Sequence, residues 1–190
     1  MIIKITKKFM EIQNLKKEIE KKRYPLAEIE AEAFKVIEEL KPYCSRIEIA
    51  GSIRRKKKDC GDIEIVAIPL PYSTGLFESG IATVVNKWPK VRGELGYGKT
   101  KYTQRILPCG IKLDLFFADE KNWGYIFAIR TGSDDFSHHT LAKRWVQCGY
   151  KGKDGYLTKD GEIIEVKEEK DLFKLLYLRY VEPEDRNLRY

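Results

Sequence analysis

The chain alternates between apolar residues at helical spacing and apolar residues at strand spacing. Residues 26–40 repeat apolar side chains every three or four positions with glutamates between them, which predicts an amphipathic helix that ends near Pro42. Residues 46–50 and 62–68 have the pattern of strands, and a Gly-Ser turn and a charged loop separate them. Further helices are expected at residues 7–22 and 76–88.

The second half of the sequence predicts a hairpin followed mainly by helices. Residues 101–107 and 111–118 are strand-like and flank a Pro-Cys-Gly turn. A helix is expected from about residue 120 towards Thr131, and Ser133 is placed to cap another helix that ends near Gly149. A second hairpin at 156–166 and a short helix at 171–178 complete the pattern.

This order of elements predicts an α+β fold in which the strands are grouped on one sheet. The strands of this sheet stop between Ala118 and Trp123, which is the expected seam. Three parts follow from it: a basic N-terminal helix over residues 1–22, a sheet-bearing part over 23–119 and a mostly helical part over 120–190.

Composition narrows the class of protein. The 190 residues are 43% hydrophobic, enough for one medium domain or two small subdomains. Lys and Arg outnumber Asp and Glu by 36 to 29, a balance found in proteins that bind polyanions and in proteins that only need solubility.

The expected environment is the cytoplasm, of a cell or of a host in which a viral or phage protein acts. No stretch approaches the roughly 20 apolar residues of a membrane helix, and the N-terminus has no secretory signal pattern. The four cysteines contain no Cys-x-x-Cys pair, so we expect reduced thiols. We also expect no membrane contact, and we expect a monomer.

Three acidic residues form the sharpest candidate for chemistry. Asp62 and Glu64 lie two positions apart and share one face of the expected strand, where they repel each other. Asp114 sits among Leu and Phe in the strand 111–118, an unusual place for a carboxylate without a partner. If that strand lies beside 62–68, the three acids converge and could hold two Mg²⁺ ions, for which Mn²⁺ could substitute.

Each of these acids has an ordinary explanation when it is taken alone. Asp62 and Glu64 could form a solvated face, and Asp114 could be a buried ion-pair partner of Lys112 or Arg105. The combination of the three, in this order and on expected strands, favours the metal site.

A candidate anion site precedes the acids by about ten residues. Gly51-Ser52 forms a turn in which backbone N–H groups and a hydroxyl can approach phosphate oxygens. Arg54 and Arg55 follow directly, and guanidinium groups bind phosphate bidentately.

Together these motifs resemble the nucleotidyltransferase signature of DNA polymerase family X, the polymerase-beta type. Residues 50–55 and 60–65 carry the broad superfamily pattern, whereas Thr131-Gly132-Ser133 and residues 182–186 are what point to family X. Matches at residues 23–25, 112–115 and 123–124 extend the resemblance over about residues 23–187.

The resemblance implies a catalytic core with a nucleotidyltransferase palm over 23–119 and a nucleotide- and duplex-binding subdomain over 120–190. It implies that Asp62, Glu64 and Asp114 hold two metal ions and that Asp114 also activates the primer 3′-hydroxyl. The implied nucleotide-binding residues are Gly51, Ser52, Arg55, Gly61, Arg23, Gly132, Ser133 and Asp134. The residues expected to contact DNA are Lys112 and Arg54.

The sequence departs from the family pattern in three places. Ile129-Arg130 replaces the usual aromatic pair before Thr-Gly-Ser, so we expect weaker exclusion of ribonucleotides. Ser137-His138 stands where an asparagine near the base is common. No lyase or helix-hairpin-helix domain precedes residue 23, so lyase activity is not expected.

The expected function is a template-directed DNA polymerase that adds a deoxynucleotide to a primer 3′-hydroxyl, most simply to fill short gaps during DNA repair. Its expected partners are gapped or primed DNA and a deoxynucleoside triphosphate. The alternatives are a nucleotidyltransferase that acts on an RNA end, a protein or a small molecule, and a nucleic-acid binder without catalysis.

Overall fold

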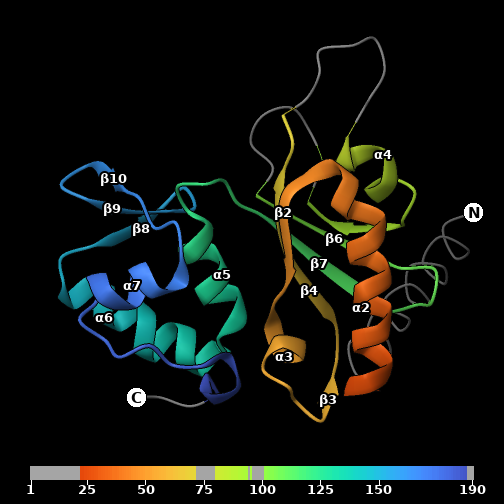
Figure 1. The fold of residues 1–190 in the computed structure, drawn as a ribbon, viewed down its shortest axis with the longest axis horizontal. Helices are drawn as coiled ribbons and strands as arrows, with labels where there is room; N and C mark the ends of the chain where they lie inside the picture. The colour runs from red at the N-terminus through yellow and green to blue at the C-terminus, as the bar shows by residue number, and fades with distance from the viewer. Residues whose placement is uncertain (1–21, 72–79, 94, 96–100, 188–190) are drawn as a thin grey trace, which may run out of the picture.

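The computed structural model describes residues 22–71, 80–93, 95 and 101–187, and a mixed sheet stands at its centre (Figure 1). Two helices cover one face of this sheet, and the C-terminal part of the chain lies against the other. The expected α+β class is confirmed, but the strands are not grouped on one sheet: β8, β9 and β10 form a separate sheet, as do β1 and β3. None of the helices in the described residues has the length and apolar character needed to cross a bilayer.

The central sheet has five strands, and only one neighbouring pair in it is parallel. That pair is β4 with β7, and in its register Glu64 lies opposite Asp114. A parallel pair needs a crossover connection, which here runs through α4, β5 and β6. The strand order is β2 (Cys44–Ile49), β4 (Ile63–Pro69), β7 (Lys112–Phe117), β6 (Tyr102–Ile106) and β5 (Lys90–Arg92).

The two faces of the sheet carry different side chains because residues alternate along each strand. Ile63, Ile65, Leu113 and Leu115 are fully buried in one cluster with α2 (Leu26–Leu40) and α4 (Ile81–Val85). Burial of each such side chain contributes roughly 1.5–3 kcal/mol. The other face, with Val66 and Phe116, packs on Trp123 and Phe127 of α5 (Trp123–Thr131).

The C-terminal part has a core of its own, built around Phe136, Leu157 and Phe173. A small antiparallel sheet in the order β10-β9-β8 closes one side of it. The elements of this part after α5 are the π-helix η2 (Phe136–Ala142), α6 (Lys143–Gln147), β8 (Lys151–Lys153), β9 (Tyr156–Lys159), β10 (Glu162–Ile164), α7 (Glu169–Leu175) and the 3-10 helix η3 (Pro183–Asp185).

A buried ion-pair network fastens the C-terminal part to the sheet. Glu169 accepts hydrogen bonds from Arg54 of the short helix α3 (Gly51–Arg54), at 2.8 and 2.6 Å, and from Arg186. Burial alone would raise the pKa of Glu169, but the two guanidinium groups outweigh burial and lower it. Removing one partner of such a network leaves a buried charge unpaired, at a cost of about 3–5 kcal/mol.

Several expected elements are confirmed, with shifts at their ends. These are the helix 26–40, the two strands that carry the acids, the hairpin about residues 108–110 and the later hairpin at β9–β10. The cap at Ser133 is confirmed because its hydroxyl accepts the N–H of Phe136 at 3.1 Å. The end near Gly149 is confirmed by its positive φ of 80°.

Other expectations are wrong in detail. The Gly-Ser turn is the first turn of α3, and Asp62 precedes β4 rather than lying in it. The helix expected over 76–88 is the five-residue α4 in its described part, and residues 76–79 lie outside the described residues. Apart from Lys22, so does the helix expected over 7–22. The small elements that the pattern did not indicate are η1 (Lys41–Tyr43), β1 (Tyr24–Pro25), β3 (Asp59–Cys60), β5, β8 and η3.

The close packing of α5 against the chain before α7 gives a stability prediction. Gly124 donates its N–H to Val166 O at 2.8 Å, and a Cβ at this position would collide with the backbone of Glu168. Gly124→Ala should therefore lower the free energy of unfolding by about 2 kcal/mol, measured by denaturant titration. Ala27→Ser on the exposed face of α2 is the control and should change it by less than about 0.5 kcal/mol. Equal stabilities of the two variants would contradict this packing.

Candidate active site

The predicted pairing of the two acid-bearing strands is confirmed. Glu64 and Asp114 lie opposite each other in the parallel register of β4 and β7, so both point to the same face of the sheet. That face is the one turned towards α5, because Val66 and Phe116, two positions further along the same strands, pack there. Asp62 is two positions before Glu64 and comes close enough to Lys112 on β7 for an ion pair of 3.0 Å.

Asp114 is held by two neutral groups. The Tyr102 hydroxyl and the Gln104 amide each donate a hydrogen bond of 2.6 Å to Oδ1 of Asp114. Burial raises the pKa of Asp114, and these two hydrogen bonds oppose the rise without cancelling it. From the sequence, Asp114 could be an ion-pair partner of Lys112 or Arg105. In the structure, Lys112 pairs with Asp62, and Arg105 donates a hydrogen bond to Asn86 Oδ1 at 3.2 Å.

Glu64 is the most perturbed acid of the group. Burial of its carboxyl, followed by the negative charges of Asp62 and Asp114, raises the pKa of Glu64 to about 8. Arg55 and Arg130 act in the opposite direction. Two acids in one low-dielectric site resist ionising together, and perturbed carboxyls of this kind are frequent at functional sites.

Gly51 is required where it stands. Its φ is 61°, a conformation that L side chains rarely adopt, and a Cβ there would collide with the carboxyl of Glu64. The first turn of α3 therefore lies directly against Glu64. This contact brings the candidate anion site next to the acids.

A cavity of about 810 Å³ lies beside Asp62 and Glu64, and several expected phosphate-binding residues line it. We call it the acid cavity. Arg55 donates to Thr131 O at 2.7 Å and to Asn187 Oδ1 at 3.2 Å, and burial lowers its pKa. The other expected residues on its wall are Ser52, Arg23, Gly61 and Lys112. Arg23 is fixed there by hydrogen bonds to the side chain and backbone of Asp59.

The C-terminal part supplies the opposite wall of the acid cavity. Gly132, Ser133 and Asp134, which are expected to bind nucleotide, line it. The Ser133 hydroxyl also donates to Asn187 O at 3.1 Å, so it fixes the local backbone. A Cβ on Gly132 would collide with the Ser137 hydroxyl, which donates to Ile129 O at 2.8 Å.

Three predicted site residues do not line the acid cavity: Gly51 and Asp114, which lie against or beside Glu64, and Arg54, which lies elsewhere. The guanidinium of Arg54 lies 3.8 Å from the centroid of the Phe127 ring and is bound to Glu169, inside the seam between the two parts of the chain. A contact with DNA would require it to leave this network. The DNA-binding role of Arg54 is therefore not supported by its position.

The acids fit a divalent cation by their chemistry. Within the described residues, no three His, Cys, Asp or Glu side chains already converge as a ready-made metal cage. Burial and, after it, the charges of Asp62 and Asp114 raise the pKa of Glu64, and a bound divalent cation would offset both. Carboxylates are the ligands that Mg²⁺ prefers. Asp62, Glu64 and Asp114 would hold it, with Asp62 exchanging its partner Lys112 for the ion.

Sequence reasoning missed three residues that contact or face the acids. Tyr102 and Gln104 bind Asp114, and Arg130 stacks on Phe116 at 4.0 Å beside Glu64. Gln104 could have been found: a hairpin centred on residue 109 places residue 104 opposite residue 114, as observed. The position of Arg130 near Glu64 could not be predicted in this way, because it depends on how α5 crosses the sheet.

The comparisons with known proteins bear on the C-terminal wall. A family model described as DNA polymerase beta thumb matches residues 127–187, about a third of the chain. No curated protein matches the chain significantly. The match supports a relationship to family X polymerases, a DNA-polymerase-related role and DNA binding. The matched range contains Gly132, Ser133 and Asp134 of the acid cavity.

The raised pKa of Glu64 predicts an unusual pH dependence of stability. The folded protein keeps a proton that the unfolded chain releases, so the metal-free protein should lose stability as pH rises from about 4.5 to about 8. Glu64→Gln should be more stable than the wild type at pH 8 and have a flatter profile. Thermal unfolding in chelator across this range measures both effects.

Glu162→Gln, on the exposed strand β10, is the control and should follow the wild-type profile. A Glu64→Gln profile with the wild-type slope would show that this carboxyl is not the group that titrates.

Proposed function

We propose that this protein is a template-directed DNA polymerase. It transfers a deoxynucleoside monophosphate to a primer 3′-hydroxyl, with release of pyrophosphate, on gapped or primed DNA. The observation that carries the proposal is the parallel register that sets Glu64 beside Asp114, with Asp62 next to them and the wall of a thumb-related segment opposite. The sheet-bearing part then corresponds to a nucleotidyltransferase palm.

The acids supply the centre of the proposed reaction. Asp62, Glu64 and Asp114 would hold two Mg²⁺ ions, which lower the pKa of the attacking hydroxyl and neutralise charge on the leaving pyrophosphate. Both hydrogen bonds to Asp114 end on Oδ1, which leaves Oδ2 to face the primer 3′-hydroxyl. Tyr102 and Gln104 thereby fix the orientation of the carboxylate before substrate binds.

The basic residues of the acid cavity orient the triphosphate. Ser52 offers a hydroxyl donor, the backbone at Gly61 offers an N–H, and Arg23 and Arg55 offer charged donors. Arg55 is already tied to the C-terminal part through Thr131 O and Asn187. Binding of the phosphates to Arg55 therefore links the nucleotide to both walls of the cavity. Lys112, once released from Asp62, can reach a primer phosphate.

Short-gap filling during repair is the role that we propose for this activity. The protein would act as a monomer in the cytoplasm, of a cell or of an infected host. A transferase that labels an RNA end, a protein or a small molecule has the same acids and differs in needing no template. Extension assays decide between the two.

Asp114→Asn should abolish nucleotide transfer while the protein stays folded. The change keeps the size of the side chain and removes the charge that binds the cation and activates the hydroxyl, so kcat should fall by a factor of at least about 10³. The assay is extension of a labelled one-nucleotide-gap duplex with Mg²⁺ and each nucleotide in turn. Asp160→Asn, at the β9–β10 turn, is the control and should retain wild-type turnover.

Extension by the wild type that follows the template base supports a polymerase. Labelling that ignores the template, or occurs only on RNA or protein, would replace this function by the alternative. If the kcat of Asp114→Asn is close to that of the wild type, Asp114 does not take part in catalysis and the proposed mechanism is wrong.

Ile129 and Arg130 predict weak discrimination between sugars. Ile129 lines the acid cavity where the family pattern has an aromatic residue, and Arg130 is exposed beside it. We expect kcat/KM for a ribonucleotide to lie within about 100-fold of that for the matching deoxyribonucleotide. Steady-state single-nucleotide incorporation with both sugars measures the ratio. A preference above about 10⁴ would mean that another group excludes the 2′-hydroxyl.

A further inference from the structure

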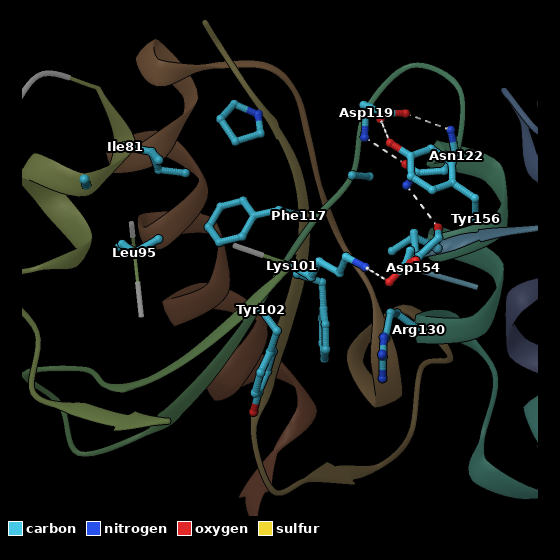
Figure 2. Close-up of a pocket in the computed structure, with 16 residues that line it drawn as sticks. Ile81, Leu95, Lys101, Tyr102, Phe117, Asp119, Asn122, Arg130, Asp154 and Tyr156 are labelled. Atoms are coloured by element: carbon cyan, nitrogen blue, oxygen red, sulfur yellow. Dashed lines mark hydrogen bonds and ion pairs between the residues drawn. The ribbon is translucent and has the colours of Figure 1, made fainter. Parts of the chain in front are cut away.

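Polar groups on the wall of a second cavity are bound to one another. This cavity, of about 860 Å³, lies at the end of the sheet where strands β4 and β7 stop (Figure 2). Its Lys101 forms an ion pair with Asp154 at 3.3 Å, and its Asn122 donates to Gly155 O at 3.0 Å. Both contacts hold the β8–β9 turn in place. A different arrangement is found at the end of α7.

Tyr177 follows α7 and has the most exposed ring of the described residues, with 83% of its surface open to solvent. Its φ is 54°. Tyr177 donates its N–H to Lys174 O at 3.1 Å, and Leu178 donates its N–H to Phe173 O at 2.9 Å. These two hydrogen bonds form a Schellman motif, a helix ending in which glycine usually takes the left-handed position.

A tyrosine in this position is unfavourable for the folded state. A positive φ is a rare outlier for a bulky residue, and an exposed ring gains nothing from burial. The other described non-glycine residues with a positive φ are polar: Lys56, Asp154 and Asp160. Local backbone strain of this kind is concentrated at functional sites. The ring of Tyr177 is therefore a candidate contact for a partner.

Helix α6 lies against the end of α7 (Figure 1). Arg144 of α6 donates from Nε to Leu176 O at 2.8 Å, so its guanidinium is next to the backbone that carries Tyr177. Two more basic residues, Lys174 and Arg179, flank Tyr177 in the chain. None of these residues lines the acid cavity. We call the following group the α6–α7 surface: Arg144, Lys174, Tyr177 and Arg179.

The α6–α7 surface is positively charged. Lys174 and Arg179 are exposed, and Arg144 is partly exposed. Within the part of the chain that the structure describes, none of these three cations forms an ion pair with an acid. The sequence has no Asp or Glu within residues 174–181 or within residues 143–151. An anionic partner therefore fits this surface.

An exposed aromatic ring with cations on both sides suits a single-stranded nucleic acid. Unpaired bases stack on exposed aromatic side chains, while Lys and Arg bind the phosphates between them. The bases of a duplex are already stacked on one another, so a duplex can use the charges of the surface but not its ring. The ring and the cations together thus favour an unpaired strand.

We propose that the α6–α7 surface binds single-stranded DNA, with one base stacked on Tyr177 and neighbouring phosphates bound by Lys174, Arg179 and Arg144. This site is separate from the acid cavity and goes beyond the proposed nucleotide transfer. It concerns binding alone and does not depend on catalysis. In the proposed polymerase, the surface holds an unpaired stretch of the DNA substrate.

Tyr177→Gly separates the role of the ring from the stability of the fold. Glycine adopts a φ of 54° without strain, so the variant should unfold at a temperature at least as high as the wild type. Its Kd for a fluorescein-labelled oligothymidylate should rise about tenfold, the value of about one stacked base. Fluorescence anisotropy in chelator measures this constant. Tyr177→Phe keeps the ring and should bind within about twofold of the wild type.

A charge variant and a control complete the test. Arg179→Gln should reduce the slope of log Kd against log salt by about 0.7, the value of one phosphate contact with a single strand. Phe34→Ala removes another exposed ring, on α2, which stands one helical turn from Glu30 and Glu38. Because the charges around Phe34 are acidic, this control should leave the Kd unchanged.

Three results would overturn the proposal. One is a Tyr177→Gly variant that binds the oligothymidylate as tightly as the wild type. Another is an equal loss of affinity for the oligothymidylate and for a blunt duplex, because only unpaired bases can stack on the ring. The third is an equal loss in Phe34→Ala. Failure of the wild type to extend a primer would instead overturn the polymerase function and leave these binding constants as they are.

Discussion

Two carboxylates on neighbouring parallel strands, Glu64 and Asp114, repel each other in a largely enclosed site, and the surrounding structure is arranged to tolerate that repulsion. Tyr102 and Gln104 bind one oxygen of Asp114, Lys112 pairs with Asp62, and Arg55 and Arg130 face Glu64 with positive charge. The parallel register itself needs the long crossover through α4, β5 and β6. Buried like charges are costly, so we expect this arrangement to lower the stability of the metal-free protein and to favour the binding of a divalent cation.

The seam between the two parts of the chain decides what the acids can reach. Glu169, bound by Arg54 and Arg186, holds α7 against α3, and α3 in turn lies on Glu64 through Gly51. The C-terminal part is therefore fixed near the acids, and it forms one wall of the acid cavity beside Asp62 and Glu64. The match of residues 127–187 to a polymerase beta thumb belongs to this same part. In the proposed enzyme, the acid cavity receives the triphosphate.

Much of the fold and of the acid group followed from local pattern. The alternation along residues 62–68 and 111–118 placed Glu64 and Asp114 on the same face once their strands were paired, and the structure has that pairing. The positions of Arg54 and Arg130 could not be obtained in this way, because each depends on the packing of α5 and α7 against the sheet. The charge of Arg54 led to the prediction that it contacts DNA. In the structure, Arg54 is instead paired with the buried Glu169 and joins the C-terminal part to the sheet. The β5 and β8 strands were missed because each has three residues, too few to show a period.

Binding of Mn²⁺, followed by electron paramagnetic resonance, tests the central claim most directly because it needs neither DNA nor turnover. With a non-hydrolysable deoxynucleoside triphosphate present at pH 8, the wild type should bind two ions per chain. A variant that combines Asp62→Asn with Asp114→Asn should retain at most the ion carried by the nucleotide itself. Equal Mn²⁺ binding by the wild type and this variant would show that the acids of β4 and β7 do not form a metal site.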